Sequence, residues 1–278
     1  MKTMGTVALG AITSLALSAS ALAENLAGKP IPGGHHFQRS VTPVMDDITW
    51  LDDFLHVIIG VIVLFVVGLL AYIALKFTRA KNPEPATFTH NTTIEVIWTA
   101  VPVLILIVIA IPSVKLLFLQ LDVPEADLTI KATGNQWFWT YEYPDQEVEF
   151  DAVMLDREEL EDYGYADDEY LLATDERVIV PVDAIVHVLV TASDVIHAWT
   201  IPSFGSKIDA MPGRINETWF QATEVGTYFG QCSELCGKDH TYMPIVVEVV
   251  SQEDYETWVL EMASRDDEPK TRLAAAAE

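Results

Sequence analysis

Basic residues are scarce in this chain. Its 278 residues include 16 Lys and Arg against 41 Asp and Glu, which gives a formal net charge of −25. The sequence has no basic patch and no glycine-rich phosphate loop, so nucleic acids and nucleotides are not the expected ligands. Half of the residues are nonetheless hydrophobic. A single soluble domain rarely combines these two features, so we expect the apolar and the acidic residues in different parts of the chain.

Cysteine is scarcer still, with Cys232 and Cys236 alone. No Cys-x-x-Cys-His motif occurs, which excludes a c-type haem attached to this chain. Neither cysteine lies near the N-terminus, so a lipoprotein anchor is not expected. Histidine is also limited, at seven residues.

The N-terminal segment has the pattern of a secretory signal. Residues 1–23 combine a basic start, an apolar run too short to span a bilayer and a small-residue cleavage site ending at Ala23. We predict a cleaved signal over 1–23 and an irregular periplasmic arm over 24–50. Paired His35 and His36 lie in this arm, where nothing nearby completes a metal site, so a solvated arm is the favoured interpretation.

Two long apolar runs follow within residues 51–119. Leu55–Leu75 is 21 residues long and would rise about 31 Å as a helix, and a second run extends from Val96 to Leu119. Both predict transmembrane helices, because a buried hairpin in a soluble protein would be shorter and less apolar. The connector carries three basic residues and one acid, which predicts a cytoplasmic connector and a periplasmic C-terminal domain.

From about residue 120 the hydrophobic period changes to two. Five segments predict strands within a domain over 120–264: Asp127–Thr133, Trp137–Tyr143, Val178–Val182, Ala184–Val190 and Pro244–Val250. Short strands broken by Gly, Pro and Asp favour a Greek-key sandwich or barrel. Ser251 is the expected cap of a short terminal helix, and residues 265–278 are expected to be a disordered tail.

Potential metal ligands gather near the end of the chain. Cys232, Cys236, His240 and Met243 follow one another at spacings of four, four and three, and His197 lies 35 residues before Cys232. Thiolate, imidazole and thioether ligands together select copper. A mononuclear site needs only one thiolate, whereas two could bridge two copper ions. A disulfide remains an alternative for an exported chain, and a structural zinc site is disfavoured because Met is a poor zinc ligand.

The motif Cys232-Ser-Glu-Leu-Cys236-Gly-Lys-Asp-His240-Thr-Tyr-Met243, with His197 upstream, resembles subunit II of haem-copper cytochrome c oxidases. The resemblance covers nearly the whole mature chain. It implies a cupredoxin-like domain in which these five side chains, with the backbone carbonyl of Glu234, hold the dinuclear copper centre CuA. It further implies that the side chain of Glu234 contributes to a Mg²⁺ site shared with a partner subunit.

Other roles also come from the resemblance. Trp137, in Gly-Asn-Gln-Trp-Phe-Trp, would be the surface residue through which electrons enter, although Trp and Tyr ordinarily indicate packing. Glu95 would stand at a proton-uptake channel, with snorkelling to the interface as the alternative. Between Asp122 and Asp183 lie 19 acidic and three basic residues, an acidity that suits a basic partner, solubility or a saline habitat. Six carboxylates become candidates for docking cytochrome c: Glu142, Asp145, Glu147, Glu149, Asp151 and Asp194.

We therefore predict a two-helix anchor in a bacterial inner membrane that carries an exported copper domain. The expected function is electron transfer from cytochrome c to haem in a catalytic partner subunit, which reduces oxygen and translocates protons. The resemblance implies that this partner holds the haems and a further copper ion, because this chain lacks the histidine set that two haems and another copper would need. A metal-free quinol oxidase subunit is disfavoured because the ligand set is complete. A copper chaperone or storage protein would not need the acidic surface or the Trp cluster. His187, in a predicted strand, is interpreted as structural, and residues 156–175 as an additional excursion.

Overall fold

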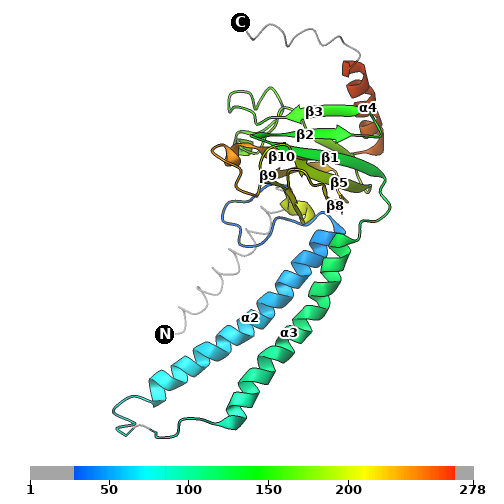
Figure 1. Cartoon of the computed structure of the whole chain (residues 1–278). Helices are drawn as coiled ribbons and strands as arrows, with labels where there is room; N and C mark the ends of the chain where they lie inside the picture. The colour runs from blue at the N-terminus through cyan, green and yellow to red at the C-terminus, as the bar shows by residue number, and fades with distance from the viewer. Residues whose placement is uncertain (1–27, 85, 267–278) are drawn as a thin grey trace, which may run out of the picture. The chain divides into compact units, whose positions relative to one another are not determined.

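The computed structural model describes residues 28–84 and 86–266, so the predicted signal over 1–23 lies outside the described residues. The chain divides into two units. One consists of Asp47–Leu119, and the other joins residues before Asp47 to those from Gln120 onwards. Figure 1 shows the two long helices of the chain and its layered β domain.

Helix α2 extends over Pro43–Lys76 and helix α3 over Thr92–Leu121. The Thr42 hydroxyl accepts a hydrogen bond from the Met45 N–H at 3.0 Å, and Pro43 occupies the first helical position. Helix α2 therefore begins within the arm that was predicted to be irregular over 24–50. The irregular segment ends at residue 42 and not at residue 50. Most apolar side chains of both helices are exposed around the whole circumference, which is the pattern of a membrane span.

The β domain contains three sheets. The first has the strand order β3-β2-β1-β5-β8, the second β4-β10-β9, and the third β6-β7. The bounds are β1 Leu128–Asn135, β2 Phe138–Tyr143, β3 Val148–Ala152, β4 Val178–Pro181, β5 Ile185–Ala192, β6 His197–Ile201, β7 Ser206–Ala210, β8 Asn216–Gln221, β9 Gly226–Gln231 and β10 Pro244–Val250. Short 3₁₀ turns η1, η2 and η3 lie at Asp167–Glu169, Pro202–Phe204 and His240–Tyr242.

The alternation expected from the sequence positions the core. Strands β1, β2 and β5 alternate buried and half-buried residues, so each directs one face inward. Strands β4 and β10 are buried on nearly every residue. Trp139, Trp199, Phe220 and Tyr228 belong to one hydrophobic core shared by all three sheets. The sheets form an open sandwich and do not close into a barrel.

The N-terminal arm is partly built into this core. Val41 is buried; its N–H donates to the Ser203 carbonyl at 3.2 Å, and its own carbonyl accepts from the Thr223 N–H at 2.9 Å. His35 and His36 are exposed. The arm before α2 is therefore irregular, as predicted, but its last residues are part of the β domain.

The excursion over residues 156–175 has a small core of its own. Leu155, Leu160, Tyr165 and Ala173 pack together with Phe229 of β9 and Val246 of β10. Lys29 of the arm forms ion pairs with the excursion residues Asp168, at 2.9 Å, and Glu169, at 3.2 Å.

The domain ends with helix α4, Gln252–Asp266. The Ser251 hydroxyl accepts from the Asp254 N–H at 3.1 Å, which confirms the predicted cap. The ring of Trp258 in this helix packs against the ring of Tyr143, with a distance of 5.0 Å between the ring centroids. The predicted tail falls beyond Asp266, outside the described residues, except for its first two positions.

Candidate metal centre

One loop carries most of the candidate ligands. Residues 232–243 connect β9 to β10, whose antiparallel pairing brings Gln231 opposite Pro244. The loop is closed at its base, because the Cys232 N–H donates to the Met243 carbonyl at 3.2 Å. It is also attached to β6, since the Ser233 N–H donates to the Ala198 carbonyl at 3.1 Å. His197, the first residue of β6, is thereby held beside the loop.

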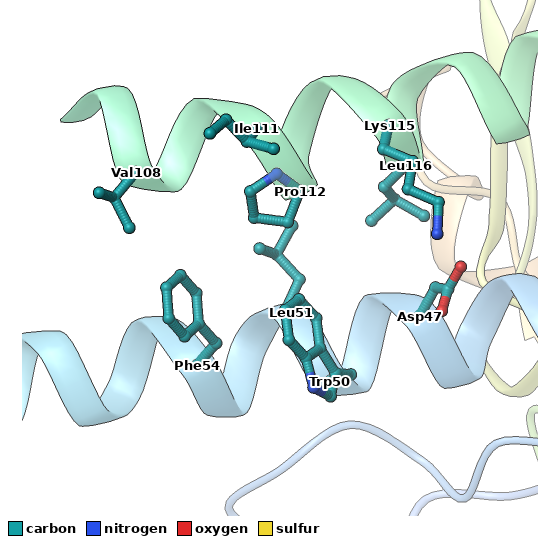
Figure 2. Close-up of a pocket in the computed structure, with 9 residues that line it drawn as sticks. All are labelled: Asp47, Trp50, Leu51, Phe54, Val108, Ile111, Pro112, Lys115 and Leu116. Carbon is teal, nitrogen blue, oxygen red and sulfur yellow. The ribbon is translucent and has the colours of Figure 1, made fainter. Parts of the chain in front are cut away.

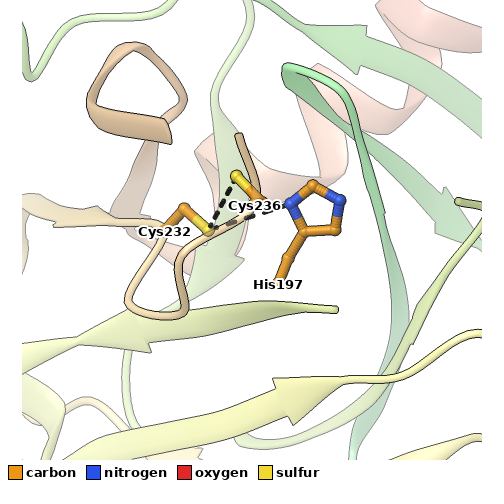
Figure 3. A group of neighbouring side chains, drawn as sticks. All are labelled: His197, Cys232 and Cys236. Carbon is orange, nitrogen blue, oxygen red and sulfur yellow. Dashed lines mark hydrogen bonds between the residues drawn. The ribbon is translucent and has the colours of Figure 1, made fainter. Parts of the chain in front are cut away.

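The predicted donors meet in a single cluster. Figure 3 shows Cys232 and Cys236 of the loop together with the His197 ring, whose ligand atoms lie within 4.8 Å of one another. The two sulfur atoms are 3.9 Å apart. Cys232 Sγ lies 3.8 Å from His197 Nδ1 and 3.3 Å from the Glu234 carbonyl oxygen.

The second thiol has a matching environment. Cys236 Sγ lies 3.5 Å from His240 Nδ1 and 3.5 Å from Met243 Sδ. Each thiol therefore has one imidazole and one weaker donor beside it. His197, Met243 and both cysteines are buried, His240 is half-buried, and Glu234 is exposed. Both cysteines are free, so the disulfide considered from the sequence is not formed in this structure.

His197 is oriented by residues beyond the donor set. Its Nε2 contacts Asp194 Oδ1 at 2.9 Å, and because a carboxylate only accepts, Nε2 carries the proton and Nδ1 faces Cys232. The ring packs edge-on against Trp139 at a centroid distance of 6.0 Å. A Cβ atom at Gly134 would lie 2.9 Å from the ring carbon atoms Cγ and Cδ2, so only glycine allows β1 to approach this closely.

The thiols and the imidazole influence each other's protonation. Burial disfavours ionisation of Cys232, but its contacts with His197, with the Glu234 and Ala198 backbone and with His240 together outweigh burial and lower the pKa of this thiol to about 7. Burial, followed by the like charge of an ionised Cys232, raises the pKa of Cys236 to about 12. Burial also disfavours the imidazolium, yet the contacts with Cys232 and Asp194 raise the pKa of His197. Cys232 thus ionises more readily than Cys236, and a bound metal would favour both thiolates.

Trp137 was predicted to begin a strand over Trp137–Tyr143, but it lies in the turn between β1 and β2, one residue before β2 begins. Trp137 is half-buried at the edge of the core that contains the fully buried Trp139. The half-buried Trp137 ring would lie 2.9 Å from a Cβ atom at Gly237, and Lys238 Nζ is 5.5 Å from the ring centroid. Trp137 thus packs against the 232–243 loop, which carries most of the candidate ligands and is called the ligand loop below.

Gln136 connects the same parts and was not recognised from the sequence. Its side-chain amide donates to the Cys236 carbonyl at 2.8 Å, and its backbone N–H donates to Asp194 Oδ2 at 2.7 Å. One residue therefore joins the turn that carries Trp137 to the cysteine loop and to the carboxylate that holds His197. The quoted Gly-Asn-Gln-Trp stretch contained this signal, but no spacing rule identifies a bridge between separate loops.

The structure separates the six docking candidates. Glu142 and Glu149 are paired directly across β2 and β3, and Asp151 lies opposite Thr140 on the same outer face. Asp145 and Glu147 lie in the β2–β3 turn, at the end of β2 remote from Trp137 and about 20 Å away along the strand. Asp194 is distinct, because it is engaged by His197 and by two backbone N–H groups.

Glu95 and His187 have local partners. The Asn91 side chain accepts from the Ile94 N–H at 3.2 Å, and Glu95 Oε1 accepts from the Asn91 N–H at 3.3 Å, so Glu95 takes part in capping α3. His187 of β5 contacts Glu217 of β8 at 3.1 Å, and neither residue is among the cluster around Cys232.

Two family models match the chain over adjacent regions. The cytochrome c oxidase subunit II transmembrane domain matches residues 30–116, and the periplasmic domain of the same subunit matches residues 128–250. Cytochrome c oxidase subunit 2 of Cereibacter sphaeroides is 46% identical over 268 residues, which cover 91% of this chain and 88% of that protein. The chain belongs to the cytochrome c oxidase subunit II family.

Two further subunit II proteins are similar to this chain. A probable cytochrome c oxidase subunit 2 of Rickettsia bellii is 50% identical and covers 84% of this chain and 86% of that protein. A crystal structure of the periplasmic domain of subunit II from Bradyrhizobium japonicum is 50% identical, covers 52% of this chain and 99% of that domain, and has a TM-score of 0.47.

Family membership confirms the predicted class and fold. The chain is a subunit of an oxidoreductase with a general role in electron transfer, and its two apolar helices form a membrane anchor followed by a periplasmic, cupredoxin-like β domain. The His197, Cys232 and Cys236 group can bind a metal ion, as copper binding requires.

Proposed function

We propose that this chain is the electron-entry subunit of its oxidase. It accepts electrons from cytochrome c at a dinuclear copper centre and delivers them to haem in a catalytic partner subunit, where oxygen is reduced and protons are translocated. The observation that carries the proposal is the paired donor set, in which two thiols 3.9 Å apart each have their own imidazole.

The donor set fits two copper ions better than one. The proposed ligands are the side chains of His197, Cys232, Cys236, His240 and Met243 with the carbonyl oxygen of Glu234. Soft thiolate, imidazole and thioether donors are those that copper prefers. A single ion would leave one thiol and one imidazole of this set unused, although both are held in the same cluster. When bound, the dinuclear centre supplies a carrier that changes by one electron at a time.

The protein's part is to keep this donor set in place. The loop is closed by the Cys232–Met243 backbone hydrogen bond and attached to β6 through Ser233, so its ends cannot separate when the charge of the centre changes. Burial of both thiols and of Met243 keeps water away. A storage or chaperone function would need accessible ligands and labile metal, which makes this buried donor set a poor match for it.

Electron entry is proposed at Trp137. Its half-buried ring packs on the ligand loop, and the neighbouring Gln136 hydrogen-bonds directly to the Cys236 carbonyl. This path connects the surface to a proposed ligand through one residue and one hydrogen bond. Of the docking candidates, Asp151 lies at the Trp137 end of β3 and Asp145 at the opposite end, so we propose that Asp151 contributes more to cytochrome c docking.

Two further roles are proposed from family membership. The exposed side chain of Glu234 would bind Mg²⁺ together with the partner subunit, while its carbonyl faces Cys232. Glu95, at the start of α3, would belong to the entrance of the proton path. Its hydrogen bond to the Asn91 N–H would be exchanged for a proton-path contact when the partner subunit is present.

The test is copper content and electron paramagnetic resonance of the purified oxidase. We expect this subunit to hold two copper ions, with a hyperfine pattern of one unpaired electron shared by both nuclei. Cys232→Ser and Cys236→Ser should each abolish that pattern, whereas Ser233→Ala, in the same loop, should retain it. A pattern from one copper nucleus, or copper content unaffected by either cysteine variant, would refute the proposal.

Docking is tested separately by stopped-flow oxidation of reduced cytochrome c at several ionic strengths. Asp151→Asn should slow electron entry at low salt and have little effect at high salt, because salt screens charges beyond about 10 Å at 0.1 M. Asp145→Asn should have the smaller effect. Equal effects of the two variants would contradict the proposed position of the docking surface.

A further inference from the structure

A groove lies between the two helices of the membrane anchor. Its volume is about 570 Å³, and α2 and α3 each contribute one wall (Figure 2). Its lining residues, all within the 47–119 unit, are Asp47, Trp50, Leu51, Phe54, Val108, Ile111, Pro112, Lys115 and Leu116. The groove is far from the copper ligands in sequence and shares no residue with them.

The walls of the groove are apolar. On α2 the Trp50 and Phe54 rings are stacked, with centroids 5.6 Å apart and planes within 5° of each other. On α3, Val108 and Pro112 face them (Figure 2). Because these helices belong to a membrane anchor, the solvent around them is hydrocarbon. An acyl chain is therefore the molecule best suited to the walls of this groove.

The mouth of the groove is charged, in contrast to its walls. The Asp47 carboxylate and the Lys115 ammonium group face each other across it (Figure 2). Among the residues that the structure describes, neither group forms an ion pair. Lys115 lies 23 residues after the start of α3, about 35 Å along the helix, which is beyond a hydrocarbon core of about 30 Å. The charged mouth is thus at head-group level.

We propose that this groove binds one phospholipid with a zwitterionic, primary-amine head group, namely phosphatidylethanolamine. Its phosphate lies beside Lys115, its ammonium group donates hydrogen bonds to Asp47, and one acyl chain follows Phe54 and Val108. An anionic phospholipid would place a second negative charge beside Asp47, and a choline head group has no N–H to donate. The inference rests on the membrane anchor and is independent of the proposed copper centre.

The experiment is native mass spectrometry of the detergent-purified oxidase, after exchange into nanodiscs of defined phospholipid composition. The wild-type complex should retain one phosphatidylethanolamine in preference to phosphatidylglycerol or phosphatidylcholine. Asp47→Asn and Lys115→Gln should each lower its occupancy about fivefold, the change expected for one charge contact at a membrane surface. Asp53→Asn, an exposed acid of α2 outside the groove, should leave occupancy unchanged.

Equal retention of all three lipids, or equal loss in Asp53→Asn and Asp47→Asn, would overturn the proposal. The competing occupant is a side chain of a partner subunit, and a photoreactive benzoyl-phenylalanine in place of Phe54 distinguishes the two. We expect its product to carry the mass of a phospholipid. A cross-link to a partner subunit, or no lipid adduct, would refute the lipid site, while copper content reports separately on the proposed function.

Discussion

Replacing Asp194 by Asn separates two roles that this carboxylate could have. It was predicted from the sequence as a docking residue for cytochrome c, yet it accepts hydrogen bonds from His197 Nε2 at 2.9 Å and from the Gln136 and Val195 N–H groups at 2.7 and 2.6 Å. The amide has nearly the same shape as the carboxylate. The substitution therefore removes the charge and leaves most of the packing intact.

The structure sets the size of the expected effect. Hydrogen bonds to a charged group contribute roughly 1.5–3 kcal/mol, against about 1 kcal/mol for neutral pairs. Removing a residue that orients a metal-binding histidine typically weakens metal binding about 10–100-fold, which corresponds to roughly 1.4–2.8 kcal/mol. We expect a loss of copper affinity in this range for Asp194→Asn, independent of ionic strength.

The assay is competition for copper between the purified oxidase and a soluble chelator, at low and at high salt. Asp151→Asn is the matched control, because that carboxylate accepts a hydrogen bond from Thr140 and does not touch His197. If Asp194→Asn kept copper as tightly as Asp151→Asn and changed only the salt dependence of electron entry, the orienting role would be wrong and docking would be the better explanation.

Three further substitutions test packing and hydrogen bonding within the β domain and its terminal helix. Tyr255→Phe should stabilise the detergent-solubilised chain by about 1 kcal/mol in urea unfolding followed by tryptophan fluorescence, because the buried hydroxyl has no partner among the described residues. Burial, then the nearby Asp145, raises the pKa of Tyr255 to about 12. The stability from keeping the phenol neutral is therefore complete below its unfolded pKa of about 10 and is lost as the pH rises to about 12. Tyr255→Phe should remove this part of the alkaline loss of stability, and an unchanged alkaline unfolding profile would count against it. Tyr143→Phe should instead destabilise by about 1–3 kcal/mol, since its hydroxyl bonds both the N–H and the carbonyl of Ile179 at 3.0 Å; the same sign for both tyrosine variants would contradict the hydrogen-bond assignment. Gly134→Ala should displace the His197 ring and lower the free energy of unfolding by about 1–3 kcal/mol through overpacking. The displaced ring should also alter the copper hyperfine splitting, and an unaltered spectrum would contradict the close approach of β1 to His197.

The clustering of the candidate metal ligands could be predicted because their pattern is largely local. Cys232, Cys236, His240 and Met243 lie within one loop, and their residue types restrict the metal whatever their exact geometry. The two membrane helices could be predicted for a related reason, since a long uncharged apolar run has few alternatives. Strand β10, a short run of mostly apolar residues, was also predicted with its observed bounds.

Short strands with weaker patterns were missed. Strands β3, β6, β7, β8 and β9 carry charged, glycine or mixed residues, and their pairing with distant partners determines their conformation. The start of α2 was misjudged because a cap at Thr42 outweighed the glycine- and proline-containing character of the segment before it. Trp137 was assigned to a strand because the aromatic run continues across the turn that precedes β2.

By itself the sequence determined the class of the protein, its membrane anchor and the chemical identity of the proposed copper ligands, because these depend on residue type and on short spacings. Only the tertiary structure decided which residues support those ligands. Gly134, Gln136 and Asp194 come from two segments about 60 residues apart in the chain, and β1–β5 pairing brings them beside the loop of Cys232. Such contacts between distant segments follow from sheet register and packing, which no local pattern encodes.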